Sequence, residues 1–477
     1  MHTFLWHDYE TFGKNTRTAR PAQFAAIRTD AQLNEIGKPI DIFCQPAPDF
    51  LPEPEACLIT GITPQYCLQN GLPEYEFSNK ILKALSEPNT VGVGYNSIRY
   101  DDEITRFMFW RNLVDPYARE WQNGCSRWDI IDLARVTYAL RPDGIEWPHN
   151  AQGKVSFKLT DLTEANHIAH EAAHNAVSDV RATIALARLI KSKQPKLFDF
   201  YFGLRQKDKV SDEIGLHLNP RKPFLHLSSM FPSEHAHLAL VFPLALHPTN
   251  KNEVIVWDCA YDPSELFELD ASSIAKRMFT RVDELSDGAT RLPIKTIHIN
   301  KSPVVIQNLK VLDDAAQKRC QLNFELNLHH AAIAADKASR KDLTAIWKSV
   351  YQRDFEAVDV DESLYSGFIN NNDRRLLNEL RTMSPETLAK AQPSFTDSRL
   401  EELLFRYRAR NYPQTLSEAE HATWQQHCAG RLHGNTADAL NLETFFAELE
   451  RCAQNNVENV EILQHLRDYA QMITPKI

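Results

Sequence analysis

The sequence predicts an α/β domain with a mixed sheet flanked by helices, followed by a small β-barrel-like domain and an all-α C-terminal domain. Strand-like and helix-like segments alternate in the first part of the chain. Short apolar runs bounded by Pro, Asn and Asp occupy residues 223–310, and helical spacing dominates from about Asp313. The 477 residues suffice for several domains. We expect domains over residues 1–195, 196–350 and 351–477.

Each expected domain has its own pattern of strand-like and helix-like segments. In the first, the expected strands are Thr3–Glu10, Gln23–Thr29, Ile40–Gln45 and Thr90–Tyr95, and helices are expected directly after Thr90–Tyr95 and over Asn175–Ser192. In the second, the expected strands include Leu238–Leu246, Glu253–Trp257 and Ile294–Asn300. In the third, Leu442, Phe445 and Leu449 have helical spacing, and the acidic segment Glu356–Glu362 is expected to be a linker.

The composition limits the class of protein. No stretch approaches the roughly 18–20 apolar residues of a membrane span, and the N-terminus lacks the basic and apolar segments of a signal peptide. The eight cysteines are scattered without a Cys-x-x-Cys pair, which favours reduced thiols. We therefore expect a soluble cytoplasmic protein that does not bind membranes. The net charge of −10 argues against a protein that coats nucleic acid, but metal-holding carboxylates leave a nuclease possible.

The first chemical motif is a pair of acids at the end of the first expected strand. Asp8 and Glu10 are two residues apart, so on a strand they project to the same side. Two carboxylates held in this way suit a hard divalent cation such as Mg²⁺. The signal is weak by itself, because Asp354 and Glu356 have the same spacing and a solvated surface pair is the ordinary explanation.

Two further elements complete the pattern. Asp101 opens the helix that follows the fourth expected strand, where helix capping is the ordinary explanation. His174 and Asp179 lie at the start of a later helix, and Asn175 is its expected N-cap. A His–Asp pair in the helical tail repeats their spacing, but no acid pair lies beside it. Only the first set combines all of these groups within one α/β region.

The motifs Asp8-x-Glu10, Asp101 and His174-x-x-x-x-Asp179 resemble those of the DEDD exonucleases with a catalytic histidine, the DnaQ-like superfamily, whose fold is ribonuclease H-like. The domain order and four segments resemble the bacterial exonuclease I family more closely; the segments are His7–Gly13, Arg20–Ala26, Ser126–Asp129 and Tyr407–Asn411. The resemblance covers most of the chain. It implies an enzyme that degrades single-stranded DNA processively from the 3′ end to 5′-mononucleotides, in DNA repair or recombination.

The resemblance also implies a role for each motif residue. Two Mg²⁺ ions, for which Mn²⁺ can substitute, would be held by Asp8, Glu10 and Asp179, with Asp8 bridging them. Asp101 would act mainly through bound water. His174 would accept the proton of the attacking water, because an imidazole titrates near neutrality.

Binding residues are expected around this site. The segment Ile59–Thr63 resembles the family's "GIT" turn, which touches the terminal nucleotide, and the expected substrate contacts are Glu10, Thr11, Gly61, Ile62 and Tyr100. Tyr9, Phe12 and Tyr100 lie beside the motif acids and are candidates to stack on bases, with core packing as the alternative. Arg399, Arg406 and Arg410 share one helix face, which predicts a solvated flank or, as the alternative, a phosphate track.

The resemblance implies one protein partner, the acidic C-terminal tail of single-stranded DNA-binding protein. Arg141, Lys222 and Arg340 are the expected contacts, because carboxylates bind Arg and Lys. We expect a monomer. Two alternatives stay open: an exoribonuclease or proofreading-type exonuclease with the same core, and a non-catalytic nucleic-acid-binding scaffold. The presence of every motif acid argues against the scaffold.

Overall fold

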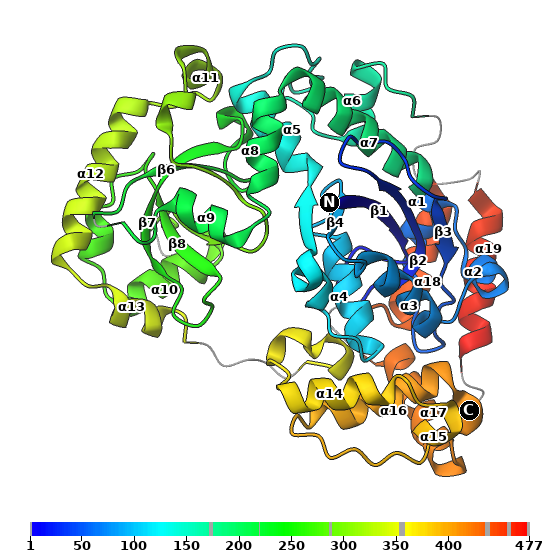
Figure 1. Ribbon diagram of the computed structural model, residues 1–477. Helices are drawn as coiled ribbons and strands as arrows, with labels where there is room; N and C mark the ends of the chain where they lie inside the picture. The colour runs from blue at the N-terminus through cyan, green and yellow to red at the C-terminus, as the bar shows by residue number, and fades with distance from the viewer. Residues whose placement is uncertain are drawn as a thin grey trace. The chain divides into compact units, whose positions relative to one another are not determined.

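The computed structural model describes residues 2–170, 175–218, 220–285, 289–352, 358–434, 439–455 and 459–474 (Figure 1). The chain forms two compact units. Unit 1 comprises residues 1–126, 170–181 and 355–477, and unit 2 comprises residues 127–169 and 182–354. The predicted fold class is confirmed: an α/β layer with a mixed sheet, a small β-rich domain and a helical C-terminal part are all present. Among the described helices, none is long and apolar enough to cross a membrane.

The first sheet has the strand order β3-β2-β1-β4-β5. Its strands are β1 (Thr3–Thr11), β2 (Pro21–Thr29), β3 (Ile40–Phe43), β4 (Thr90–Gly94) and β5 (Ser126–Asp129). Strand β1 lies at the centre, antiparallel to β2 and parallel to β4. The sheet is therefore mixed, and the strand that carries the first acid pair is fixed by a neighbour on each side.

Helices of the α/β layer pack against this sheet. They are α1 (Pro54–Thr60), α2 (Pro64–Asn70), α3 (Glu74–Leu85) and α4 (Asp101–Arg111), and α7 (Ala176–Lys193) begins in the same unit. Leu5 and Phe24 of the sheet share a buried cluster with Phe77 of α3 and with Ile104 and Met108 of α4. This cluster holds the start of α4 near the end of β1.

The C-terminal helices belong to the same unit and share its core. They are α14 (Asn371–Leu380), α15 (Pro385–Leu388), α16 (Arg399–Asn411), α17 (Glu418–His433), α18 (Leu442–Asn455) and α19 (Val460–Ile473), preceded by the 3₁₀ segment η7 (Val360–Ser366). Phe445 of α18 clusters with Phe12 beyond β1, and Leu403 of α16 clusters with Trp110 of α4. These two apolar clusters join the helical part to the α/β layer.

Unit 2 is built on a second sheet with the order β10-β6-β7-β8-β9, and every pairing in it is antiparallel. Its strands are β6 (Phe224–Leu227), β7 (Leu238–Leu246), β8 (Glu253–Asp258), β9 (Ile294–His298) and β10 (Val304–Ile306). Its helices are α5 (Ile130–Leu140), α6 (Leu159–Ala165), α8 (Pro195–Gly203), α9 (Lys207–Ile214), α10 (Ala271–Phe279), α11 (Asp314–Arg319), α12 (Phe324–Arg340) and α13 (Thr344–Val350). The three strands predicted here are all present, and β6 and β10 were not predicted.

Candidate active site

The acid pair of β1 points to one side of the sheet. Asp8 and Glu10 are half-buried, whereas Tyr9 between them is buried, which is the alternation expected of a strand. The pairing with β2 shifts register between Glu10 and Thr11. A bulge of this kind increases local twist and is frequent beside active sites.

Helix α7 brings a third carboxylate to this pair. Asn175 Oδ1 accepts a hydrogen bond of 3.2 Å from the Ser178 amide, as an N-capping side chain does. Asp179 follows in the first turns of the helix and is half-buried. Carboxylate oxygens of Asp8, Glu10 and Asp179 all lie within 4.8 Å of one another. The structure thus gathers residues that are about 170 positions apart in the chain.

The first turn of α4 holds three consecutive acids with three different partners. The Tyr9 amide donates a hydrogen bond of 3.0 Å to Asp101, which directs this carboxylate toward the end of β1. Asp102 forms a buried ion pair of 2.5 Å with Arg119, and Glu103 pairs with Arg106 at 2.7 Å. Asp101 is the acid of this turn that is joined to the strand of Asp8 and Glu10.

One contact at the site has no counterpart in the sequence prediction. The His170 Nε2 atom is hydrogen-bonded to the Asp179 carboxylate, and the His170 side chain is only 7% exposed. No spacing rule identified this histidine, because it precedes the recognised motif and lies outside any expected helix. The predicted base, His174, lies outside the described residues.

The electrostatics of the cluster show uncompensated negative charge. Burial, and then repulsion by Asp179, raise the pKa of Asp8 to about 8. Burial, followed by the charges of Asp8 and Asp179, likewise raises the pKa of Glu10 to about 8. Burial and the nearby Asp8 and Asp102 raise the pKa of Asp101 well above its ordinary value. Buried carboxylates that repel one another are stabilised when one of them binds a proton or when a cation binds among them.

The donor set fits a hard divalent cation. It consists of carboxylate oxygens, which Mg²⁺ prefers, on a rigid strand and a capped helix. A cation among Asp8, Glu10 and Asp179 would offset the repulsion that helps to raise the pKa values of Asp8 and Glu10.

The residues that are expected to contact the substrate differ in their surroundings. The Thr11 hydroxyl donates to the Gly13 carbonyl at 2.7 Å and lies 2.5 Å from the Tyr100 hydroxyl, so the two side chains form one group beside Glu10. Gly61 ends α1 in a left-handed conformation with φ of 71°, which explains the glycine in this turn. Ile62 is partly buried against the cluster that includes Phe12. Their contact with a nucleotide stays a prediction.

Two of the predicted stacking residues are core residues instead. Tyr9 is 4% exposed and Phe12 is 1% exposed. The Thr105 hydroxyl donates to the Tyr9 hydroxyl at 3.0 Å, and Phe12 packs in the cluster shared with α18 and α19. The stacking prediction is wrong for these two rings in this structure, and the alternative of core packing holds.

The arginine face of α16 also differs from both of its predicted roles. Arg410 is held by Asp49 and Asp361, and Arg406 by Asp359, Asp361 and Glu402. Arg399 pairs with Asp397 at 2.7 Å and donates to the Ser363 carbonyl. These side chains are buried or largely buried in ion pairs, so they form neither a solvated flank nor a phosphate track.

The three predicted partner-binding residues lie in unit 2 and remain accessible. Arg141 is 39% exposed and lies 3.8 Å from Asp313, Lys222 is exposed, and Arg340 is 75% exposed beside Asp336. Arg340 also lines a cavity of about 880 Å³ together with Arg221, Lys341 and Lys348. Apolar residues of the same lining include Leu246 and Trp347.

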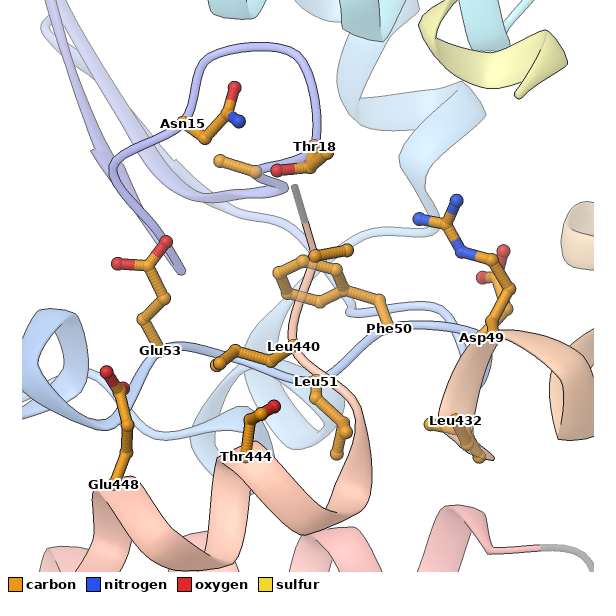
Figure 2. A pocket seen from close by; sticks show the side chains of 13 residues that line it. Asn15, Thr18, Asp49, Phe50, Leu51, Glu53, Leu432, Leu440, Thr444 and Glu448 are labelled. Carbon is orange, nitrogen blue, oxygen red and sulfur yellow. The ribbon is translucent and has the colours of Figure 1, made fainter. Parts of the chain in front are cut away.

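A separate cavity of about 440 Å³ lies in unit 1 (Figure 2). Asp49, Glu53 and Phe50 line it from the α/β layer, and Thr444 and Glu448 line it from α18. Its lining contains none of the motif acids. It is therefore distinct from the acid cluster.

Comparisons with known proteins agree with this architecture. Residues 5–187 match the family model of an exonuclease domain, residues 205–353 that of the exonuclease I SH3-like domain, and residues 358–473 that of the exonuclease I C-terminal domain. The chain is 43% identical to exodeoxyribonuclease I of Escherichia coli K12 over 99% of its own length and 98% of that protein. It is 41% identical to exodeoxyribonuclease I of Haemophilus influenzae, with 98% of both chains covered.

Solved structures show the same similarity. Exonuclease I of Methylocaldum szegediense superimposes with a TM-score of 0.92 at 45% identity and full coverage of both chains. E. coli exonuclease I bound to a dA16 oligonucleotide superimposes with a TM-score of 0.92 at 42% identity, covering 99% of this chain and 100% of the other. An exonuclease I complex with the SSB C-terminal peptide gives a TM-score of 0.91 at 41% identity over both full chains. The chain therefore belongs to the exonuclease I family of 3′→5′ exodeoxyribonucleases that act on single-stranded DNA.

Proposed function

We propose that the enzyme hydrolyses single-stranded DNA with two Mg²⁺ ions, for which Mn²⁺ can substitute, held by Asp8, Glu10 and Asp179. The supporting observation is the approach of their carboxylate oxygens to within 4.8 Å of one another. The exonuclease domain implies dependence on a divalent metal. Bound ions of this type stabilise the charge on the attacking and leaving oxygens of an in-line displacement.

Side chains of the enzyme would accept the proton and position the other groups of the site. His174 would accept a proton from the attacking water, whose oxygen forms a bond to the terminal phosphorus. The bond from phosphorus to the 3′ oxygen breaks, and that oxygen leaves as the new 3′-hydroxyl after protonation. The product is a 5′-mononucleotide. Asp101 would support the site through its bond to the Tyr9 amide, and His170 would orient Asp179.

The number of ions is tested by Mn²⁺ binding followed by electron paramagnetic resonance. We expect two sites per chain in the presence of a hydrolysis-resistant phosphorothioate strand, and loss of high-affinity binding in Asp179→Asn. Glu379→Gln is the control, because this exposed acid pairs with Arg375 on α14 of the same unit. One site per chain, or full binding by Asp179→Asn, would contradict the two-ion proposal.

We also propose that the enzyme is a processive monomer that acts in DNA repair or recombination. Processivity is measured with a 5′-labelled strand under an excess of unlabelled trap. Intact substrate together with very short products supports it, whereas a spread of intermediate lengths contradicts it. Sedimentation of the free protein measures the oligomeric state.

The acidic C-terminal tail of single-stranded DNA-binding protein is the proposed partner, and unit 2 the proposed surface. A tail of this kind presents carboxylates, which arginine and lysine bind well. The cavity beside Arg340 combines cations with apolar walls, and Arg340 itself is exposed. Arg141 and Lys222 are further accessible cations of the unit.

Fluorescence anisotropy with a labelled acidic tail peptide tests this proposal. Arg340→Ala, Lys222→Ala and Arg141→Ala should each weaken binding and reduce its dependence on salt. Arg281→Ala is the control, since this exposed cation of unit 2 is not among the proposed contacts. Equal binding by all four variants would remove these residues from the partner site.

A further inference from the structure

Tyr9 lies between the two acids of β1, and its ring is buried on the opposite side of the strand. It packs in one apolar cluster with Phe24, Ile104 and Met108. A phenylalanine would fill the same apolar space. A hydroxyl buried there costs free energy unless it is hydrogen-bonded. The Tyr9 hydroxyl therefore needs a specific partner, and the partner that it has belongs to α4.

Thr105 is this partner, and it lies one helical turn after Asp101. Its side chain is fully buried. The Thr105 hydroxyl lies 3.0 Å from the Tyr9 hydroxyl and 2.8 Å from the Asp101 carbonyl oxygen. A threonine hydroxyl has one proton and two lone pairs, so it can donate to the phenol, or donate to the carbonyl while it accepts from the phenol. In both arrangements Thr105 ties the ring of Tyr9 to the helix of Asp101.

Tyr9 is thus bonded to the start of α4 at two points. Its amide donates to the Asp101 carboxylate at 3.0 Å, and its hydroxyl meets Thr105 one turn further along the helix. The two bonded pairs are separated by 92 and 96 residues in the chain. Two bonds from one residue fix both the distance and the rotation of the helix start relative to the strand, whereas a single bond would leave the helix free to pivot.

This double attachment opposes a repulsive force within the site. Burial, and then repulsion by Asp8, raise the pKa of Asp101 above its ordinary value. The same repulsion between the ionised groups pushes the start of α4 away from β1. A catalytic site must hold its groups within about 0.5 Å of their productive positions. The hydroxyl pair of Tyr9 and Thr105 is uncharged, so it restrains Asp101 without adding to the repulsion.

We propose that Tyr9 and Thr105 are positioning residues of the exonuclease reaction, whose paired hydroxyls hold Asp101 in register with Asp8 and Glu10. Both side chains are buried, at 4% and 0% exposure, so they act through Asp101 and not by touching the strand. The inference rests on the proposed function of the acid cluster. It gives two core residues a consequence for catalysis that packing alone would not give them.

Variants that remove one hydroxyl and preserve the packing test the proposal. Tyr9→Phe and Thr105→Val should fold, and kcat for single-strand hydrolysis should fall about 10- to 100-fold, because a group that orients a site residue is lost. KM for a long strand should be unchanged. Mn²⁺ affinity, measured by electron paramagnetic resonance without any strand, should also fall. Thr105→Ser keeps the hydroxyl and should match wild type in both measurements.

Two controls remove similar hydroxyls away from the acids. Tyr469→Phe alters a tyrosine of unit 1 that is 1% exposed and donates to the Ala47 carbonyl at 3.2 Å. Thr137→Val removes a buried hydroxyl that donates at 2.7 Å to the Leu133 carbonyl, four residues earlier in α5. Both controls should keep the kcat and the Mn²⁺ affinity of wild type.

The double variant Tyr9→Phe/Thr105→Val should lose no more activity than either single variant, because both changes break one link. Wild-type kcat and Mn²⁺ affinity in the two single variants would overturn the proposal. Additive losses in the double variant, equal losses in the controls, or a loss in Thr105→Ser as large as that in Thr105→Val would overturn it as well. Failure of the wild-type enzyme both to bind Mn²⁺ and to cleave single strands would instead contradict the proposed function.

Discussion

The Tyr9 amide donates a hydrogen bond of 3.0 Å to the Asp101 carboxylate, and this contact joins the central strand to the first turn of α4. This hydrogen bond distinguishes the role of Asp101 from that of the adjacent Asp102. Asp101 faces the strand of Asp8 and Glu10, whereas Asp102 is paired with the buried Arg119. Sequence spacing alone does not distinguish them.

Substitution of each acid should have a different effect. Asp101→Asn keeps an oxygen that accepts from the Tyr9 amide, so the fold should persist while kcat falls about 10- to 100-fold. Asp102→Asn leaves the buried Arg119 without its counter-charge, so the free energy of unfolding should fall by about 3–5 kcal/mol. Chemical denaturation and single-strand hydrolysis, measured on both proteins, check the prediction. A larger stability loss in Asp101→Asn than in Asp102→Asn would reverse the assignment.

Asp361 should make stability depend on acid pH. Burial alone would raise its pKa, but Arg410, Arg20 and Arg406 hold the pKa of this carboxyl well below its ordinary value. As the pH falls below about 4, the unfolded chain therefore binds this proton first, and the free energy of unfolding decreases. Asp361→Asn should lower stability at neutral pH and flatten the acid-induced decrease. Urea denaturation between neutral and acid pH measures both effects, with Glu379→Gln as the exposed control; equal pH slopes in Asp361→Asn and wild type would contradict the account.

Arg410 should matter for folding and not for DNA binding. Its guanidinium lies 2.7 Å from Asp49 and also pairs with Asp361, and its side chain is 3% exposed. Arg410→Met should cost about 3–5 kcal/mol of unfolding free energy. If the variant is folded at low temperature, its salt dependence of single-strand affinity should equal that of wild type, because no phosphate contact is lost. A slope reduced by about one would restore the phosphate-track hypothesis.

The sequence predicted those features of the site that depend on the local alternation of side chains along a strand. Alternation along β1 places Asp8 and Glu10 on one side, and the same alternation places Tyr9 on the other, in the core. Nearness to a motif acid in sequence therefore did not mean access to substrate. One partner of Arg410 is Asp49, 361 residues away, and no local spacing shows such a pair. His170 was missed for the same reason, because no helix or strand spacing connects it to Asp179, the residue nine positions later with which it forms a hydrogen bond.

The enzyme should stop at duplex DNA. Entry of a paired 3′ end requires unstacking and unpairing, at a few kcal/mol per step. The sequence has no Gly-x-x-x-x-Gly-Lys-Ser/Thr phosphate loop to drive strand separation. A 5′-labelled strand with a duplex segment and a 3′ overhang should shorten to near the junction and persist, while the same strand without its complement is degraded. Equal rates through duplex and single strand would disprove this prediction.

The catalytic role of the acid cluster is tested most directly by hydrolysis of a 5′-labelled single strand by wild type, Asp8→Ala and Asp179→Ala at saturating Mg²⁺. Circular dichroism verifies the fold of each variant. We expect wild type to shorten the strand from its 3′ end. Both variants should be folded and lose most of the activity, because each lacks an oxygen of the cluster whose members lie within 4.8 Å of one another. Turnover near the wild-type rate by folded Asp8→Ala protein would contradict it.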